Sequence, residues 1–336
     1  MDDNNNKIKI NMLSMADSVD GQGVGSAYLE LMKLLNEDGK NDFEIFLNKG
    51  TKYDIIHAHT VEPRNYLKLK FSKNPTVAYV HFLPDTLDGS IKLPKPIFKI
   101  FKKYVISFYK SADYLVVVNP IFKKDIAKAG IKEDKITYIP NFVSKEMFYK
   151  KTDKEIKDIR KKLGIKENKF VVLGAGQIQN RKGVIDFVEV AKKLPKIDFI
   201  WAGGFSFGGI TDGHHDLKKI MENPPKNVRF LGIVPRNEMN DLFNASDLLF
   251  VPSYNELFPM TILEAISTDT PILLRDLELY EDILFKKYLK GSNNDEFSEI
   301  IKLLSKDKKE YQNIIQENTR ILTSLLDSLI EVANLD

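Results

Sequence analysis

The chain has 336 residues, of which 43% are hydrophobic and 29% charged, so a disordered chain is excluded and two domains of roughly 150 to 170 residues are expected. The absence of cysteine excludes disulfide scaffolds, zinc–thiolate sites, iron–sulfur clusters and cysteine nucleophiles, and it fits a reducing cytosol. The 50 basic and 47 acidic side chains give a net charge of only +3, which offers no global argument for nucleic-acid binding.

Strands and helices are expected to alternate along the first part of the chain. Runs rich in β-branched and aromatic residues predict strands at 7–13 and near residues 42, 53, 76, 114 and 136. Helical patterns lie between them, including Gly25 to Asn36 and Lys95 to Lys110. This alternation predicts a parallel sheet that is covered on both faces.

The same pattern restarts after a charged stretch from Asn141 to Leu163. Further strands are predicted at 170–176, 197–204, 228–232, 247–252 and 271–275. The sequence therefore predicts an α/β protein with two doubly wound, Rossmann-like domains, 1–145 and 146–310. Residues 311–336 are expected to form a C-terminal helix that crosses back to the first domain. No run of 18 apolar residues is present, and the polar start MDDNNNKIKI is unlike a signal peptide.

The first predicted strand is followed by a glycine-rich loop, Asp20 to Ser26. Gly21, Gly23 and Gly25 permit positive φ angles and close approach of the backbone to a phosphate or a sugar. The G-x-G-x-G spacing differs from the dinucleotide fingerprint, and no P-loop G-K-[ST] follows. A plain flexible loop remains the alternative.

A second loop, after the strand at 170–176, carries Gly176, Arg181, Lys182 and Gly183. A helix N-terminus already holds partial positive charge, so two adjacent cations there favour an anionic ligand. The pattern is typical of a diphosphate clamp, and a solvated surface pair is the alternative.

A third segment, Ser253 to Ala265, has a glutamate near each end, Glu256 and Glu264. Pro259 predicts that a helix begins nearby. The carboxylates suit sugar hydroxyls, and the first helical amides suit a phosphate. Ordinary helix-capping chemistry is the alternative for either glutamate.

The five histidines give little support for a metal site. His57 and His59 should share one face of a strand, but no third ligand is evident. His214 and His215 are adjacent and should point apart. His81, directly after the strand near residue 76, is either a buried core histidine or a catalytic group.

Residues 92–110 contain six lysines and no acidic residue. At helical spacing, the apolar side chains from Ile97 to Tyr109, except Ile106, share one face, and lysines occupy the other. One interpretation is a core-packing helix with a solvated face. The other is an interfacial helix on an anionic membrane, in which Lys95, Lys99, Lys102 and Lys103 bind the surface.

Taken together, these motifs resemble the family-four retaining glycosyltransferases of the GT-B fold. The resemblance rests on the E-x7-E element of Glu256 and Glu264 with F-P between, about 75 residues after R-K-G, and on the first glycine loop. It covers essentially the whole chain. The segments GQGVGSAYLE, YVHFLPDTLDGSIKLPK, YLVVVNPIF and PILLRDLELYEDIL are similar to bacterial diglycosyl-diacylglycerol synthases. Leu257 departs from the family pattern, which often has glycine there.

The resemblance implies a GT-B fold whose two domains face each other across a cleft, with a role for each motif. Glu264 would bind the ribose of a UDP-sugar, Gly232-Ile-Val234 the uracil, and Glu256 the donor sugar. The implied donor-binding residues are Gly25, Gly176, Arg181, Lys182, Ile233, Val234, Glu256, Phe258, Pro259, Met260, Thr261 and Glu264. The implied catalytic residues are His81, Glu256, Arg181 and Lys182.

The expected activity is transfer of glucose or galactose from UDP, with retention, to glucosyl-diacylglycerol. UDP-sugar would be a substrate, and because no D-x-D motif occurs, no obligate metal or other cofactor is expected. The expected location is the cytoplasm, peripherally bound to the inner face of the membrane. The alternatives are a soluble or polyprenyl-linked acceptor, or a non-catalytic binder of sugar or nucleotide.

Overall fold

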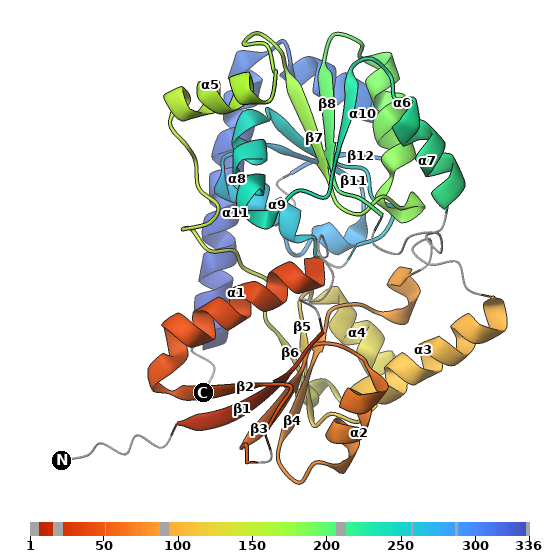
Figure 1. Ribbon diagram of the computed structural model, residues 1–336, viewed down its shortest axis with the longest axis vertical. Helices are drawn as coiled ribbons and strands as arrows, with labels where there is room; N and C mark the ends of the chain where they lie inside the picture. The colour runs from red at the N-terminus through yellow and green to blue at the C-terminus, as the bar shows by residue number, and fades with distance from the viewer. Residues whose placement is uncertain are drawn as a thin grey trace. The chain divides into compact units, whose positions relative to one another are not determined.

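The computed structural model describes residues 7–15, 23–50, 52–87, 94–205, 213–256, 258–285 and 288–333 (Figure 1). Gly21, Lys92 and Leu257, which the motifs above include, lie outside these ranges. The chain divides into two compact units, one built from residues up to Asn141 and the other chiefly from Phe142 onward.

The first unit contains a parallel sheet of six strands in the order β2-β1-β3-β4-β5-β6. The strands are β1 (Ile8–Leu13), β2 (Phe43–Leu47), β3 (Ile55–Ala58), β4 (Thr76–Val80), β5 (Tyr114–Val117) and β6 (Ile136–Tyr138). Its α-helices are α1 (Gly23–Glu37), α2 (Pro63–Phe71), α3 (Lys95–Lys110) and α4 (Ile121–Lys128). The six strands predicted from apolar runs in this part of the chain are confirmed.

Helix α1 lies on one side of the first sheet, and α2 and α3 lie on the other (Figure 1). Tyr28 of α1 packs with Ile10 and Met12 of β1. Helix α1 begins at Gly23, so Gly23 and Gly25 belong to its first turn. The helix predicted from Gly25 to Asn36 is confirmed and begins two residues earlier, so Gly23, which was predicted to lie in the loop, belongs to the helix instead.

The second unit also contains a parallel sheet of six strands, in the order β12-β11-β10-β7-β8-β9. The strands are β7 (Val171–Ala175), β8 (Asp198–Ala202), β9 (Val228–Gly232), β10 (Leu248–Val251), β11 (Ile272–Arg275) and β12 (Leu289–Gly291). Its α-helices are α5 (Asp153–Lys162), α6 (Val184–Lys193), α7 (His214–Glu222), α8 (Arg236–Ala245), α9 (Met260–Ser267), α10 (Asn294–Leu304) and α11 (Lys308–Ala333). The five strands predicted here are confirmed, and β12 was not predicted.

The second sheet is covered on both faces, as the alternation of strands and helices predicted. Helices α6, α7 and α10 lie on one side, and α5, α8, α9 and α11 lie on the other (Figure 1). The core between the sheet and α6 includes the aromatic side chains of Phe187, Phe199, Trp201 and Phe250, all nearly inaccessible to solvent. Two doubly wound α/β units, expected from the sequence, are therefore confirmed.

The C-terminal segment forms one long helix, α11, which packs against α9 and α10 of its own unit. The amide of Asn318 donates a hydrogen bond from Nδ2 to the carbonyl of Thr270, 2.9 Å away. The prediction that this helix returns to the first unit stays a prediction. Within the described ranges, no helix combines the length and the apolar character that crossing a bilayer requires.

Candidate functional site

The order of strands in the second sheet reverses between β7 and β10, which are neighbours in space but not in sequence. At such a switch point, the loops after the two strands diverge to opposite faces and leave a crevice beyond their carboxyl ends, where α/β proteins bind ligands. The two loops at this point are those that carry Arg181, Lys182 and Glu256. The sheet topology therefore brings together two motifs that lie about 75 residues apart in the sequence.

The loop after β7 is held tightly by two glycines with positive φ. Gly176 has a φ of 135°, and the aliphatic stem of Lys182 passes about 3.7 Å from where a Cβ on this glycine would stand. Gly183 has a φ of 68°, and a Cβ there would lie 2.3 Å from the carbonyl oxygen of Pro252 in the β10 loop. Only glycine allows this contact, which fixes the spacing between the two loops.

Glu256 accepts a charged hydrogen bond from Lys182 and forms an ion pair with Arg181, both of the opposite loop. Its Oε1 lies 2.5 Å from Nζ of Lys182, and its Oε2 lies 3.5 Å from Nη1 of Arg181. Arg181 also donates from Nη1 to the carbonyl of Asn255 at 2.6 Å. The side chains of Glu256, Arg181 and Lys182 are only 6%, 13% and 15% exposed. Two cations and one carboxylate thus form a nearly buried cluster with an excess of positive charge.

The electrostatics of this cluster favour the ionised carboxylate. Burial by itself would raise the pKa of Glu256, but the charges of Lys182 and Arg181 outweigh burial and lower that pKa. Burial is also the largest influence on Lys182, and it lowers the pKa of the ammonium against the opposing effect of Glu256. An anionic ligand that contacts Lys182 would favour its charged form in the same way as Glu256 does.

Tyr280 joins this cluster and was missed by the sequence reasoning. It ends the short 3₁₀ helix Glu278–Tyr280 after β11, and it is fully buried. Its hydroxyl has no hydrogen-bond partner within the described part of the protein. Burial, followed by the charge of Glu256, raises the pKa of the phenol well above its usual value. No motif signals this tyrosine, because only the fold brings it near Glu256.

Glu264 lies on α9 rather than in the loop, and it is 4% exposed. Its Oε1 lies 3.5 Å from Nη2 of Arg236, the first residue of α8. The guanidinium of Arg236 also lies 5.3 Å from the ring centre of Phe148. The sequence reasoning missed Arg236. Its place directly after the predicted uracil loop is the one signal that could have found it.

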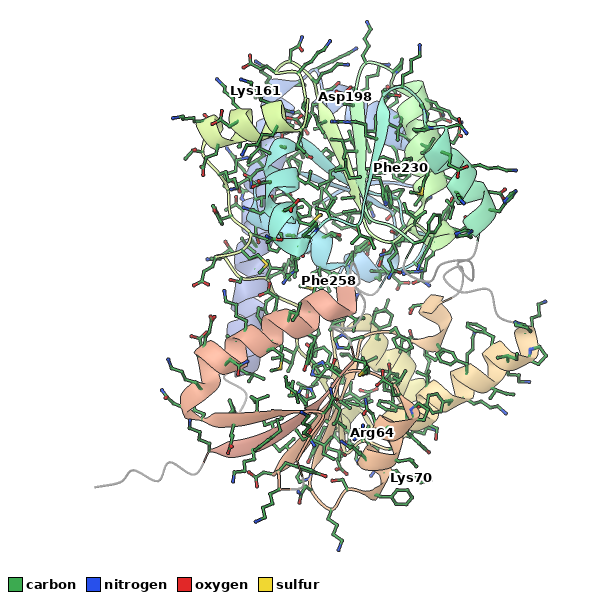
Figure 2. The ribbon with its side chains drawn as sticks, in the orientation of Figure 1. Arg64, Lys70, Lys161, Asp198, Phe230 and Phe258 are labelled. Atoms are coloured by element: carbon green, nitrogen blue, oxygen red, sulfur yellow. The ribbon has the colours of Figure 1, made fainter. Side chains whose placement is uncertain are left out.

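The remaining predicted donor-binding residues surround the same strand ends. Ile233 follows the left-handed Gly232, whose φ is 73°, and its side chain is 48% exposed. Val234 and Pro259 are half-buried. Phe258, labelled in Figure 2, and Met260 are buried at the start of α9. Met260 and Thr261 open the helix, so their N–H groups lie outside its internal hydrogen-bond ladder.

Gly25 and His81 belong to the first unit, where the structure reveals a group of histidines. His57 pairs with Val77 across β3 and β4, so His57, His59, Tyr79 and His81 share one face of the sheet. Nδ1 of His59 lies 3.1 Å from Nε2 of His81, and the rings of His57 and His59 are 4.4 Å apart. His81 is therefore a third imidazole beside His57 and His59. The sequence alone did not indicate that these three side chains lie together.

This histidine group has the character of a buried neutral cluster. Burial, with a smaller contribution from His57, lowers the pKa of His81 to about 3. Burial also lowers the pKa of His57 to about 4 and that of His59 well below its usual value. In the described residues, no group of three or more histidine, aspartate or glutamate side chains is arranged to hold a metal ion.

Helix α3 only partly matches the predicted face. Val105, Phe108 and Tyr109 are buried, whereas Ile97 and Ile100 are 52% and 68% exposed. The lysines Lys95, Lys99 and Lys103 are exposed, as predicted. The prediction that Lys102 is equally exposed is wrong, because its Nζ lies over the ring of Phe98, 4.8 Å from the centre, and the side chain is half-buried.

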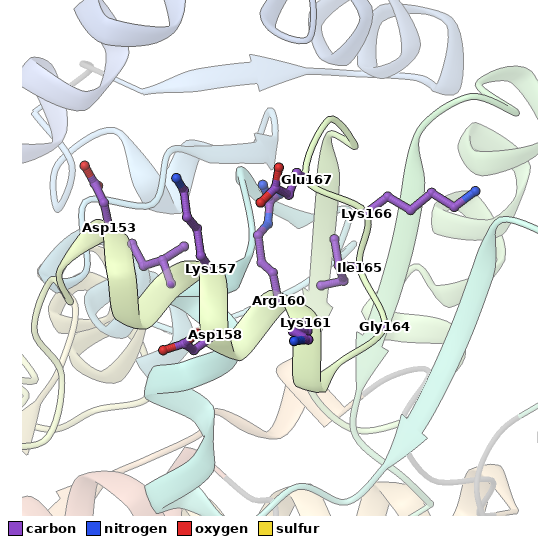
Figure 3. Close-up of a pocket in the computed structure, with 10 residues that line it drawn as sticks. Asp153, Lys157, Asp158, Arg160, Lys161, Gly164, Ile165, Lys166 and Glu167 are labelled. Atoms are coloured by element: carbon purple, nitrogen blue, oxygen red, sulfur yellow. The ribbon is translucent and has the colours of Figure 1, made fainter.

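A separate open hollow of about 990 Å³ lies beside α5 (Figure 3). Arg160 lines it, but this guanidinium already donates to the carbonyls of Ala245 and Lys169 and to the carboxylate of Asp247. The hollow contains none of the predicted site residues. Arg160 connects α5 to the rest of the second unit through these hydrogen bonds, which is a structural role. The switch point therefore remains the candidate site.

Comparison with known proteins agrees with this geometry. Residues 155–321 match the model of the glycosyl transferases group 1, and residues 40–146 match that of glycosyltransferase family 4. The chain is 50% identical over 297 residues to the α-galactosylglucosyldiacylglycerol synthase of Streptococcus pneumoniae, covering 88% of this chain and 79% of that protein. It is 30% identical to the processive diacylglycerol α-glucosyltransferase of Acholeplasma laidlawii, covering 86% and 85%.

Solved structures of similar fold extend over nearly the whole chain. The crystal structure of Anabaena HepE with UDP and glucose matches with a TM-score of 0.77 at 18% identity, covering 97% of this chain and 98% of that one. Sucrose-phosphate synthase from Thermosynechococcus elongatus matches with the same TM-score at 14% identity, covering 95% of each chain. At these identities the likeness concerns the fold alone.

Proposed function

Because the chain belongs to the family-four glycosyltransferases, we propose that it transfers a hexose, glucose or galactose, from a UDP-sugar to glucosyl-diacylglycerol, with retention. The family and the GT-B class of fold expected from the motifs are confirmed. The observation that carries the proposal is the cluster of Arg181, Lys182 and Glu256 at the switch point. The acceptor is proposed from the 50% identical relative, whose name states a glycolipid product.

The chemistry of transfer suits this cluster. When the bond between sugar and UDP breaks, the ring gains positive charge and the leaving diphosphate gains negative charge. Lys182 and Arg181 would stabilise the diphosphate, and the carboxylate of Glu256 would stabilise the ring. Glu256 is the one carboxylate that we place at the reacting sugar. We therefore favour front-face attack with the departing phosphate as base over a covalent glycosyl–enzyme.

The nucleotide would be held around the same strand ends. We place the ribose at Glu264, with Arg236 fixing the carboxylate through the 3.5 Å contact, and the uracil against Ile233 and Val234. The N–H groups of Met260 and Thr261, at the start of α9, would donate hydrogen bonds to the phosphate, and Phe258 and Pro259 would line the same loop. Gly176 lets the nucleotide approach the backbone. From the first unit, Gly25 and His81 would reach the donor sugar.

No divalent ion is proposed for the reaction. Lys182 and Arg181 supply two positive charges, and the start of α9 adds oriented amides where a metal would otherwise neutralise the diphosphate. EDTA is therefore expected to leave transfer largely intact. A complete loss of activity that Mg²⁺ or Mn²⁺ restores would contradict this assignment.

A lipid acceptor requires contact with a membrane, and we propose that α3 provides it. Exposed Lys95, Lys99 and Lys103 carry charge toward anionic headgroups, while Ile97 and Ile100 offer exposed apolar surface on the same helix. On this proposal the first unit handles membrane and acceptor, the second holds the UDP-sugar, and the protein binds peripherally at the inner face of the membrane.

A transfer assay tests the proposal. Purified protein is incubated with anionic vesicles that contain glucosyl-diacylglycerol and with each UDP-hexose in turn. We expect UDP release and a diglycosyl-diacylglycerol with an α-linkage, determined by mass spectrometry and NMR. Vesicles without the glycolipid serve as the control. Transfer only to a soluble sugar or to a polyprenyl-linked acceptor would contradict the lipid assignment. Binding of UDP without transfer to any of these acceptors would favour the non-catalytic alternative.

A further inference from the structure

His59 and His81 share a single hydrogen bond between two buried rings. Nδ1 of His59 lies 3.1 Å from Nε2 of His81, and the two side chains come from the ends of neighbouring strands β3 and β4. Rings on both sides restrict their movement. Tyr79 stacks on both imidazoles, with ring centres 5.1 Å from His59 and 4.7 Å from His81, and Tyr28 of α1 packs edge-on against His59 at 5.0 Å.

Both rings are neutral in the folded protein at physiological pH. Burial is the largest cause, and it lowers the pKa of both His59 and His81. The neighbouring groups that act on His59 are His57 and His81 themselves, so each positive charge would repel the next. A neutral imidazole carries one proton, on either Nδ1 or Nε2, and the shared hydrogen bond allows two arrangements.

The unpartnered nitrogen of His59 discriminates between these arrangements. Nε2 of His59 is buried and has no hydrogen-bond partner among the described residues. If His81 donated from Nε2, His59 would have to keep its proton on its own Nε2, which would bury an N–H without an acceptor. If His59 donates from Nδ1, its Nε2 holds only a lone pair. Buried N–H groups without a partner are the rarer and costlier case.

We propose that His59 is a positioning residue that fixes His81 in the tautomer with its proton on Nδ1. Nε2 of His81 is then committed to His59, and Nδ1–H is the group left for a ligand. His81 therefore acts as a hydrogen-bond donor to a hydroxyl oxygen of the transferred hexose and does not serve as a general base. The hydrogen bond from His81 to the hexose rests on the proposed function, but the assignment of the tautomer does not.

The tautomer can be measured directly on the unmodified protein. The chain has only five histidines, so a long-range ¹H–¹⁵N correlation spectrum of histidine-labelled protein resolves them individually. Variants that replace one histidine at a time assign the signals. We expect protonated Nδ1 and unprotonated Nε2 for both His59 and His81. A proton on Nε2 of His81 would overturn the proposal, and this outcome does not depend on whether glucosyl-diacylglycerol is the acceptor.

Three variants test the positioning role. His59→Phe keeps a ring between Tyr28 and Tyr79 but removes the donor, and kcat should fall roughly two- to tenfold, the size of one hydrogen bond, with UDP affinity unchanged. His59→Asn retains a donor and should recover most of the loss. His57→Phe is the matched control, because this ring touches His59 without sharing the hydrogen bond, and it should keep parental kcat. Equal kcat in His59→Phe and in the parent would overturn the role.

Discussion

Lys182 donates a hydrogen bond to Glu256 across 2.5 Å, and this contact joins the loops that follow β7 and β10. The residue predicted to clamp a diphosphate is thus paired with the residue predicted to contact the donor sugar. A diphosphate that reaches Lys182 has to compete with Glu256 for the ammonium. Arg181 lies 3.5 Å from the same carboxylate, so two cations contact one carboxylate at this point, and such a pair of cations favours an anionic ligand.

Glu256→Gln should separate binding from catalysis. The substitution removes the negative charge that competes with the diphosphate for Lys182 and Arg181, so UDP should bind more tightly, by roughly tenfold. Turnover should fall by about 10²-fold or more, because the developing positive charge on the sugar loses its carboxylate. Calorimetry with UDP and a transfer assay measure the two effects. Glu278→Gln, an exposed change close to Tyr280, is the control. Weaker UDP binding in Glu256→Gln would contradict the competition described above.

Lys182→Ala and Arg181→Ala should each reduce turnover by about 10²-fold or more, because each removes a charge that stabilises the leaving diphosphate. Steady-state kinetics with saturating acceptor measure the loss. Removing Lys182 also leaves the nearly buried Glu256 with one partner fewer, so thermal unfolding of each variant must be recorded beside its activity. Full activity in either folded variant would remove that residue from the clamp.

Glu264→Ala should weaken UDP binding by about 1.5 to 3 kcal/mol, because the ribose hydroxyls lose a charged acceptor. Arg236→Met should weaken it by less, since the carboxylate remains but loses the contact that orients it at 3.5 Å. Calorimetry with UDP and with uracil alone distinguishes the ribose from the base. Unchanged affinity for UDP in Glu264→Ala would rule out the ribose assignment.

The strands were predictable because long apolar runs decide them locally. The short β12 (Leu289–Gly291) was missed, since three residues at a sheet edge carry almost no pattern. The motif residues Arg181, Lys182 and Glu256 were found because each follows a predictable strand. The contact of Arg181 and Lys182 with Glu256 depends on the order of the strands in the sheet, which could not be predicted from the sequence.

Contacts made by the fold alone could not be predicted. Arg236 meets Glu264 from another helix, and His81 meets His59 from the neighbouring strand. Helical periodicity assigned Ile100 to the apolar face of α3 correctly, but it cannot tell whether anything covers that face. Ile100 is 68% exposed, which periodicity could not reveal.

The buried histidines predict that the protein loses stability in mild acid. Folding lowers the pKa of His57 from 6.5 to about 4 and that of His81 to about 3, mainly by burial. Between pH 6.5 and the pKa in the folded protein, the unfolded chain therefore binds protons that the folded chain does not. The contribution of these histidines to the free energy of unfolding is fully present above pH 6.5 and decreases as the pH falls below it. Each histidine adds a slope of up to about 1.4 kcal/mol per pH unit.

Urea unfolding between pH 7 and pH 5, where most carboxylates stay ionised, measures this slope. The double variant His57→Phe/His81→Phe should show a shallower fall than the parent, because two of the titrating groups are gone. A free energy of unfolding that stays constant over this range in the parent, at equal m-value, would contradict neutral burial of these rings.

The membrane proposal for α3 is best tested by reversing charge where the side chains are exposed. Lys95→Glu/Lys99→Glu/Lys103→Glu spares Lys102, whose Nζ lies over Phe98 and whose loss would disturb packing. The free energy of binding to anionic vesicles should weaken by about 1 kcal/mol for each lysine charge that is lost near the surface. Replacing lysine by glutamate reverses the charge and should weaken binding further. Sedimentation with vesicles measures the binding, and added salt should weaken binding of the parent in the same direction.

A control variant with charge reversal outside α3 distinguishes an effect of this helix on vesicle binding from an effect of the net charge of the protein. Lys157→Glu/Lys161→Glu/Lys166→Glu changes three exposed lysines on and after α5 by the same amount, and it should leave vesicle binding close to that of the parent. Ile100→Ser tests the apolar contribution, since a side chain that is 68% exposed can change without loss of core packing. Transfer to glucosyl-diacylglycerol in vesicles should fall together with binding, while UDP affinity stays constant. If the α3 variant sediments as the parent does, α3 is a structural helix, and the lipid acceptor then rests on the relatives alone.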